Sequence, residues 1–198
     1  MSNQPILGVV FDLDNTLVTS SLNFNEIKAA INCPIEVDIL AYIDSLSVEK
    51  RNRANQVVYD YEKADASKAK KLAGVDNILS LLEKLDIPFA VITRNNKESA
   101  SRKLDSNGIK VPLLLTRENF NAKPAPDALI YVAKYWQVPR QNVLCVGDYL
   151  YDIQMANNAN TQSCLVSYGQ DLYYADLATL VVDDLNALSQ YIIKRHNG

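Results

Sequence analysis

Short runs of Val, Ile and Leu recur along the chain, each bounded by polar or turn-forming residues. The runs are ILGVVF near residue 9, PFAVIT near 91, VPLLL near 113, NVLCVG near 145, SCLV near 165 and LVV near 181. Continuous apolar runs of this length are typical of strands that are covered on both faces. The pattern therefore predicts buried strands at these six positions.

Between these runs, apolar residues recur at the spacing of a helix. A helix is predicted from Val75 to Leu85 and another from Ala125 to Trp136, the second with its inward side formed by Leu129, Ile130, Val132 and Ala133. Strands that alternate with helices predict an α/β fold, a doubly wound, Rossmann-like parallel sheet with helices on both faces.

One segment interrupts this alternation. Residues 18–73 contain no strand candidate and read as amphipathic helical stretches such as FNEIKAAI and EVDILAYIDSL. We therefore expect a small all-helical unit at 18–73, inserted into a core domain of residues 1–17 and 74–198. Within it, Arg51, Arg53, Tyr59 and Tyr61 are candidates for substrate contact, with core packing or solvated helix faces as the alternative.

Composition and charge narrow the setting. A chain of 198 residues with 48% hydrophobic and 22% charged residues can bury a core without a disulfide or structural metal. The net charge of −3 and the scattered basic residues argue against a nucleic-acid partner. The N-terminal apolar run is far shorter than a membrane span, so no membrane partner and a cytoplasmic location are expected. Three cysteines without a C-x-x-C spacing indicate neither a disulfide framework nor a zinc site, and Cys145 and Cys164, which lie in apolar runs, are expected to be buried structural thiols.

Polar side chains follow the predicted strands, where ligands bind in an open parallel sheet. Asp12, Asp14 and Thr16 follow the first strand, Thr93 and Arg94 the second, and Asp148 and Asp152 the strand near residue 145, while Lys123 lies in the loop NAKPAPD. Four carboxylates in one crevice would repel each other by about 1 to 4 kcal/mol per pair, and one lysine cannot neutralise them. All-oxygen ligands of this kind suit Mg²⁺ completed by a substrate phosphate.

The segments DLDNT, VITRNN, KPAPD and GDYLYD, in this order, resemble the four motifs of the haloacid dehalogenase (HAD) superfamily. The inserted unit resembles the small helical cap of its phosphoglycolate-phosphatase-like subfamily, so the resemblance covers essentially the whole chain. It implies a Mg²⁺-dependent phosphatase that hydrolyses a small phosphomonoester through an aspartyl phosphate. The expected partner is a small phosphorylated metabolite.

The resemblance also implies a role for each motif residue. Asp12 would be the nucleophile, and Asp14 would protonate the leaving alcohol and later accept a proton from water. The metal ligands would be Asp12, the backbone carbonyl of Asp14, and Asp148.

The remaining motif residues would hold and support these groups. Thr93 and the amide of Arg94 would bind phosphoryl oxygens, and Lys123 would offset charge on nucleophile and phosphate. Asp152 would orient Lys123 or a metal-bound water, or else be an N-terminal helix residue favoured by the helix dipole, and Thr16 would steady the loop.

Other interpretations stay open at this point. A phosphomutase would keep the same core, and a non-catalytic phosphate-binding protein would keep the fold. Asp14 speaks against a dehalogenase and against Schiff-base chemistry on Lys28, because such members lack this acid. A signalling receiver domain would carry its aspartate after the third strand, where this chain has LLLTREN. The substrate is not identified: Asn32, Cys33 and Pro34 stand where phosphoglycolate-specific members commonly show Gly-Leu-Pro.

Overall fold

The strands predicted from the apolar runs pair into one parallel sheet. The computed structural model describes residues 4–196, and within that range the strand order is β3-β2-β1-β4-β5-β6. The strands are β1 (Gly8–Phe11), β2 (Phe89–Ile92), β3 (Leu114–Leu115), β4 (Val143–Gly147), β5 (Gln162–Val166) and β6 (Leu180–Val182). This arrangement confirms the predicted α/β class.

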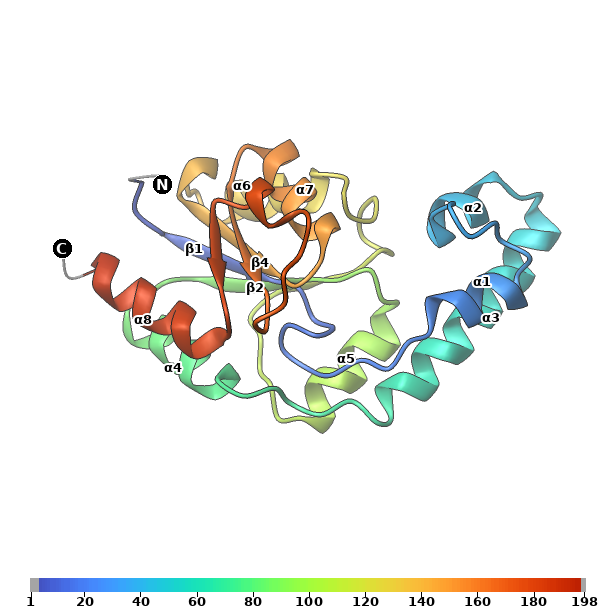
Figure 1. The fold of residues 1–198 in the computed structure, drawn as a ribbon, viewed down its shortest axis with the longest axis horizontal. Helices are drawn as coiled ribbons and strands as arrows, with labels where there is room; N and C mark the ends of the chain where they lie inside the picture. Colours follow the sequence, from blue (N-terminus) through green and yellow to red (C-terminus); the bar gives the residue numbers. More distant parts are fainter. Residues whose placement is uncertain (1–3, 197–198) are drawn as a thin grey trace.

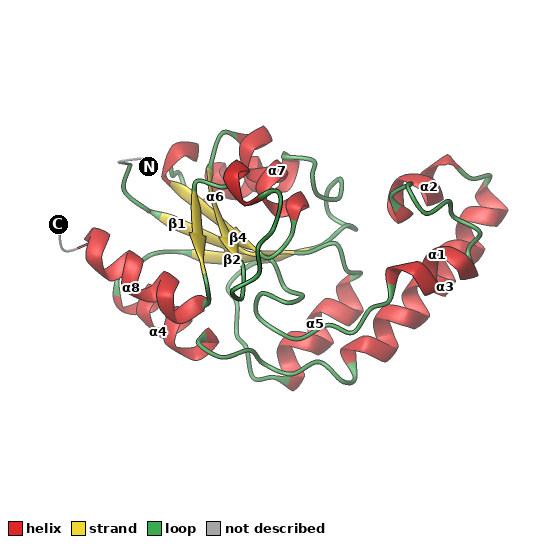
Figure 2. Cartoon of the chain, viewed as in Figure 1, coloured by secondary structure: helices red, strands yellow, loops and turns green. Residues whose placement is uncertain are grey.

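Helices cover both faces of the sheet (Figures 1 and 2). One face packs against α4 (Val75–Lys84), α5 (Lys97–Ser106) and α8 (Leu185–His196), and the other against α6 (Asp127–Tyr135) and α7 (Leu150–Ala159). Side chains of β1 alternate accordingly: Val9 and Phe11 join the first core and Val10 the second. Ile130, expected to point inward from α6, is instead 37% exposed, while its neighbour Leu129 is fully buried.

Three helices stand apart from the sheet, at the right of Figure 1. They are α1 (Phe24–Ala30), α2 (Ile39–Ser45) and α3 (Val48–Ala66), and they share a small apolar cluster that includes Ile27, Ile43 and Val58. Between residues 18 and 73, all of which the structure describes, there is no strand beyond isolated bridges of Val18 with Asp14 and Lys71. We call α1–α3 the helical unit.

Two linkers join the helical unit to the sheet, and they run side by side. The amide of Thr19 donates to the carbonyl of Lys70 at 2.8 Å, and the amide of Leu72 donates to the carbonyl of Leu17 at 3.0 Å. The helical unit also contacts the rest of the chain through α3, which packs against α5.

The chain reverses its direction of travel across the sheet between β1 and β4. From β1 it adds β2 and β3 on one side, and then returns to place β4 on the other side of β1, with Phe11 paired to Val146. Loops that follow the two strands diverge here, which opens a crevice at their carboxyl ends. Asp12 and Asp148 are the first residues beyond β1 and β4.

Two further findings concern the chain as a whole. Among the described residues, no helix is long and apolar enough to cross a membrane. Cys145 and Cys164 are free and buried, as expected, and Cys33 is free and buried as well. Burial raises the pKa of the Cys145 and Cys164 thiols far above their ordinary value, which keeps them protonated and unreactive.

Candidate active site

Three carboxylates meet in the crevice between β1 and β4. One oxygen each from Asp12, Asp148 and Asp152 lies within 4.8 Å of the others. The amide of Asp12 donates to the carbonyl of Val146 at 2.8 Å, which continues the β1–β4 ladder and fixes the start of the first loop. The sequence placed these residues at neighbouring strand ends, and the structure brings them together.

Lys123 lies among the carboxylates and is almost fully buried. Its Nζ contacts Oδ1 of Asp12 and Oδ1 of Asp152, the latter at 2.7 Å. Although burial alone would lower it, the pKa of Lys123 is raised by the charges of Asp12 and Asp152. The lysine therefore stays cationic and holds the two carboxylates in place.

One lysine does not neutralise the cluster. Burial, opposed in part by Lys123, raises the pKa of Asp12 from 3.8 to about 6. Burial and the charges of Asp12 and Asp152 raise the pKa of Asp148 from 3.8 to about 8. The raised pKa values show that Lys123 alone does not stabilise the ionised carboxylates of Asp12 and Asp148. A divalent cation bound by their oxygens would supply the missing positive charge. The donor set, which has no His or Cys, fits Mg²⁺.

Asp152 contacts both Lys123 and the start of α7, so the two interpretations considered for it are compatible. Its Oδ1 accepts from Lys123, and its Oδ2 accepts from the amide of Tyr149 at 3.2 Å, where α7 begins. The same carboxylate therefore orients the lysine and caps the helix.

Asp14 lies beside this cluster, but its side chain turns toward another lysine. Its Oδ1 accepts from Lys103 and its Oδ2 from Nδ2 of Asn95. Burial raises the pKa of Asp14 despite the nearby charge of Lys103. The next residue, Asn15, adopts a left-handed conformation with φ of 53°, which asparagine tolerates better than most residues.

Thr93 and Arg94 follow β2 at the edge of the crevice. The Thr93 hydroxyl oxygen accepts from the amide and from Nδ2 of Asn95, at 3.1 and 2.8 Å, which leaves its own proton to be donated. The Arg94 guanidinium pairs with Asp38 of the helical unit at 2.6 Å and stacks on the ring of Tyr151 at 4.6 Å. Thr16 is fully buried, and its hydroxyl lies a long 3.5 Å from Asp148.

A cavity of about 560 Å³ lies between the sheet and the helical unit, and Thr16 is not among the residues that line it. The helical unit contributes mainly apolar side chains to it, among them Ile27, Ile39 and Val58. Asp12, Asp14, Thr93, Arg94, Lys123, Asp148 and Asp152 all line this cavity. We call it the acid cleft.

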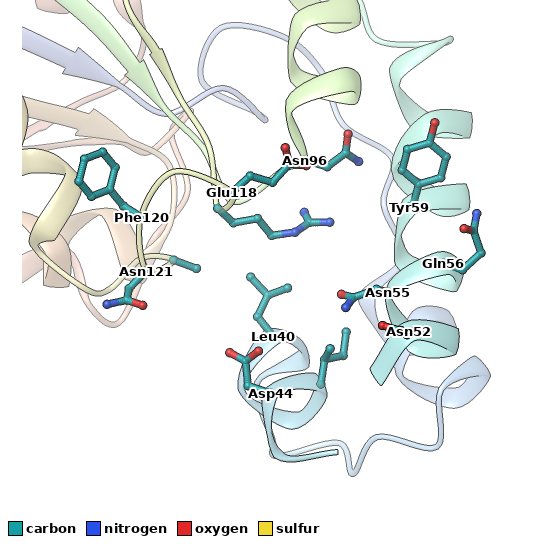
Figure 3. Close-up of a pocket in the computed structure, with 13 residues that line it drawn as sticks. Leu40, Asp44, Asn52, Asn55, Gln56, Tyr59, Asn96, Glu118, Phe120 and Asn121 are labelled. Atoms are coloured by element: carbon teal, nitrogen blue, oxygen red, sulfur yellow. The ribbon is translucent and has the colours of Figure 1, made fainter. Parts of the chain in front are cut away.

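A second cavity of about 630 Å³ shares only Leu40 with the acid cleft. Figure 3 shows its walls: Asn52, Asn55, Gln56 and Tyr59 from α3, Leu40 and Asp44 from α2, and the loop that carries Phe120 and Asn121. None of the strand-end carboxylates lines it. The reactive groups are therefore gathered in the acid cleft and not in this second cavity.

The four residues of α3 considered for substrate contact lie outside the acid cleft. The Arg51 guanidinium donates to the carbonyls of Asp44 and Leu46, and Arg53 pairs with Glu49 on an exposed face. Tyr59 donates to Glu98 at 2.6 Å, and Tyr61 packs against the apolar cluster of the helical unit. The structure thus favours the alternative interpretation for these residues.

Sequence reasoning missed several residues around the site. Asn95 was within reach, since it directly follows Arg94 in the second motif. Lys103 carried a weaker signal: it occupies the buried stripe of α5 formed with Ser99, Ala100 and Leu104, where a lysine is out of place. Asp38 and Asp65 gave no signal, because only the folded helical unit brings them to the core.

Comparisons with known proteins agree with this architecture. The chain matches the family described as haloacid dehalogenase-like hydrolase over residues 9–166. A haloacid dehalogenase-like hydrolase domain-containing protein of Arabidopsis thaliana is 29% identical, covering 83% of this chain and 74% of its own length. A phosphoglycolate phosphatase of Psychrobacter arcticus is 28% identical, covering 76% of this chain and 69% of its own length.

Solved structures show the same fold. A hydrolase from Pseudomonas syringae superposes with a TM-score of 0.81 at 20% identity, covering 95% of this chain and 98% of that one. At this identity the likeness concerns the fold alone. Because the family match spans more than half of the sequence, the chain belongs to the haloacid dehalogenase-like hydrolase family.

Proposed function

We propose that the protein is a Mg²⁺-dependent phosphatase that hydrolyses a small phosphomonoester through an aspartyl phosphate on Asp12. The observation that carries the proposal is the convergence of Asp12, Asp148 and Asp152 around Lys123. Asp14 and Thr93 line the same cleft. The phosphoglycolate phosphatase of Psychrobacter arcticus gives the reaction class a precedent.

The residues divide the reaction between them. The Asp12 carboxylate attacks phosphorus, and a P–O bond forms as the bond to the leaving oxygen breaks. Asp14 donates a proton to that oxygen and later accepts one from the water that hydrolyses the aspartyl phosphate. The products are an alcohol and inorganic phosphate, with Asp12 restored.

Three other groups of the cleft would hold the transferred phosphoryl group. The Thr93 hydroxyl and the amide of Arg94 donate to its oxygens, and Lys123 offsets the charge that shifts during transfer. Mg²⁺, held by Asp12, Asp148 and the backbone carbonyl of Asp14, would supply the charge neutralisation that the lysine alone lacks.

We also propose that the helical unit is a cap, formed by residues 18–73 on a core of residues 1–17 and 74–198. The acid cleft lies between the two parts, and the ion pair between Asp38 and Arg94, which both line the cleft, joins them. A cover of this kind excludes water from the reacting groups. Its apolar lining indicates a substrate whose organic portion is small and partly apolar.

The test measures phosphate release from a panel of sugar phosphates, phosphoglycolate, nucleotides and p-nitrophenyl phosphate, each with Mg²⁺ and with a chelator. We expect metal-dependent release by the wild type and a loss of at least about 10³-fold in Asp12→Asn, which keeps the side-chain shape. Asp171→Asn, at an exposed position outside the cleft, is the matched control. Folded wild-type protein that releases no phosphate, or Asp12→Asn that keeps its turnover, would refute the proposal.

A further inference from the structure

Lys103 is a buried cation in the stripe of α5 that faces the sheet. Its side chain is 0% exposed, although lysine is among the residues least often buried. An ammonium group carries three donors, and here all three have an acceptor: Asp14, Asp65 at 2.7 Å and Asn95 at 3.4 Å. The ammonium group therefore has little freedom to move.

Asp65 fixes the far side of this lysine. It lies at the end of α3, where its carboxylate accepts from the Ser21 amide at 2.7 Å and from the hydroxyls of Ser20 and Ser21, each at 2.9 Å. Ser20 and Ser21 belong to the first linker, and α3 leads into the second. Asp65 thus joins the base of the helical unit to the lysine.

The contact of Lys103 with Asp14 fixes which carboxylate oxygen of Asp14 is directed toward the proposed phosphate site. Lys103 engages Oδ1, so Oδ2 lies toward Asn95, whose Nδ2 also contacts the hydroxyl of Thr93 at 2.8 Å. Oδ2 is therefore on the side of the group that we propose to bind phosphate. An acid that must reach the leaving oxygen is effective only when the oxygen that carries its proton is aimed there.

We infer that Lys103 is a positioning residue, which holds Oδ1 of Asp14 so that Oδ2 carries the proton to the leaving group. This inference rests on the proposed function. Loss of Lys103 leaves Oδ1 of Asp14 without its partner, so that only Asn95 still holds the carboxylate. The change acts on the acid step without removing a phosphate-binding group. Its effect depends on how much the leaving group needs a proton.

The experiment compares kcat/KM for two substrates, because this parameter reports the steps up to release of the leaving group. Glycerol 2-phosphate has an alkoxide leaving group that needs protonation, and p-nitrophenyl phosphate has one that leaves readily without it. In Lys103→Met we expect kcat/KM to fall about 10²-fold for glycerol 2-phosphate, and by less than about fivefold for p-nitrophenyl phosphate. Asp14→Asn should show the same selectivity, and Lys71→Met, which loses the exposed ion pair with Asp76, should not.

A second variant separates positioning from folding. Lys103→Met leaves Asp65 without its cation, whereas Lys103→Met/Asp65→Asn removes one charge of each sign and keeps the net charge of the cluster. Thermal melting with and without Mg²⁺ verifies that each variant folds and binds the metal.

The double variant decides the outcome. We divide kcat/KM for glycerol 2-phosphate by kcat/KM for p-nitrophenyl phosphate. If this ratio stays below the wild-type value in the double variant, the inference is supported. A ratio that returns to the wild-type value shows that Lys103 only neutralises Asp65, and overturns it. If the folded wild type releases phosphate neither from glycerol 2-phosphate nor from any ester of the panel above, the proposed function fails, and the inference fails with it.

Discussion

Gly147, the last residue of β4, lies against the carboxylate of Asp152, which contacts Lys123. A Cβ at this position would lie 2.5 Å from the Cβ of Asp152 and closer still to its carboxyl group. Real Cβ atoms essentially never approach another atom within 3.0 Å, and ordinary contact begins at 3.4 Å. In Gly147→Ala, Asp152 must therefore move by about 1 Å.

This displacement reaches the lysine. The Lys123–Asp152 contact is 2.7 Å long, and about 1 Å more would end it as a hydrogen bond. A shift of about 1 Å in a catalytic group costs about 10²-fold in rate, and overpacking of this size destabilises a protein by about 1–3 kcal/mol. We expect kcat/KM for p-nitrophenyl phosphate to fall about 10²-fold in a protein that still folds.

Gly108→Ala is the matched control, because the same change there meets no atom within 4 Å but strains a backbone with φ of +63°. That strain costs roughly 1–2 kcal/mol, so the two variants should be similarly destabilised in chemical denaturation. Only Gly147→Ala should lose activity. Activity of Gly147→Ala within about fivefold of the wild type would refute the reasoning.

Two other predictions concern charge. The raised pKa values of Asp12, about 6, and Asp148, about 8, mean that the metal-free folded protein binds more protons than the unfolded chain between pH 4 and 8. The free energy of unfolding of the metal-free protein should therefore fall as pH rises through that window. The increase in Tm on adding Mg²⁺, measured by scanning fluorimetry, should be larger at pH 8 than at pH 5. An increase in Tm that is the same at both pH values would contradict this prediction. Arg53→Ala should change neither kcat/KM nor Tm measurably, because its partner Glu49 is equally exposed; a rise in KM would return Arg53 to the substrate site.

Local patterns were sufficient for most of the fold. Each strand of a doubly wound sheet is buried on both faces, so its sequence is a continuous apolar run. A run such as VLCVG can therefore be recognised as a strand without knowing which strands pair with it. The same order of elements places Asp12 and Asp148 at adjacent strand ends, which is why the carboxylate cluster follows from the sequence. Asp152 follows as well, because it lies one helical turn beyond Asp148.

Residues whose partners come from distant segments escaped prediction. Arg94 followed a strand and was assigned to phosphate through its amide, but its side chain meets Asp38 across 56 positions of sequence. Lys103 meets Asp14 and Asp65 in the same way. Arg51 and Tyr59 do not line the acid cleft, because of the way α3 is oriented. Helical periodicity shows which residues share a face of a helix, but not which part of the protein that face contacts.

The pairing of the two linkers has a consequence for which changes in sequence and length the chain can accept during evolution. Thr19 and Lys70 lie side by side, at a separation that a two-residue turn closes in ordinary hairpins. A segment whose two ends already meet can be shortened, lengthened or exchanged without displacing any strand of the sheet. Under the proposed function, the groups that react with phosphate lie in the core and the apolar side chains that enclose the organic part of the substrate lie in the helical unit. Substrate preference can therefore change through the helical unit, provided that Asp65 keeps its contact with Lys103.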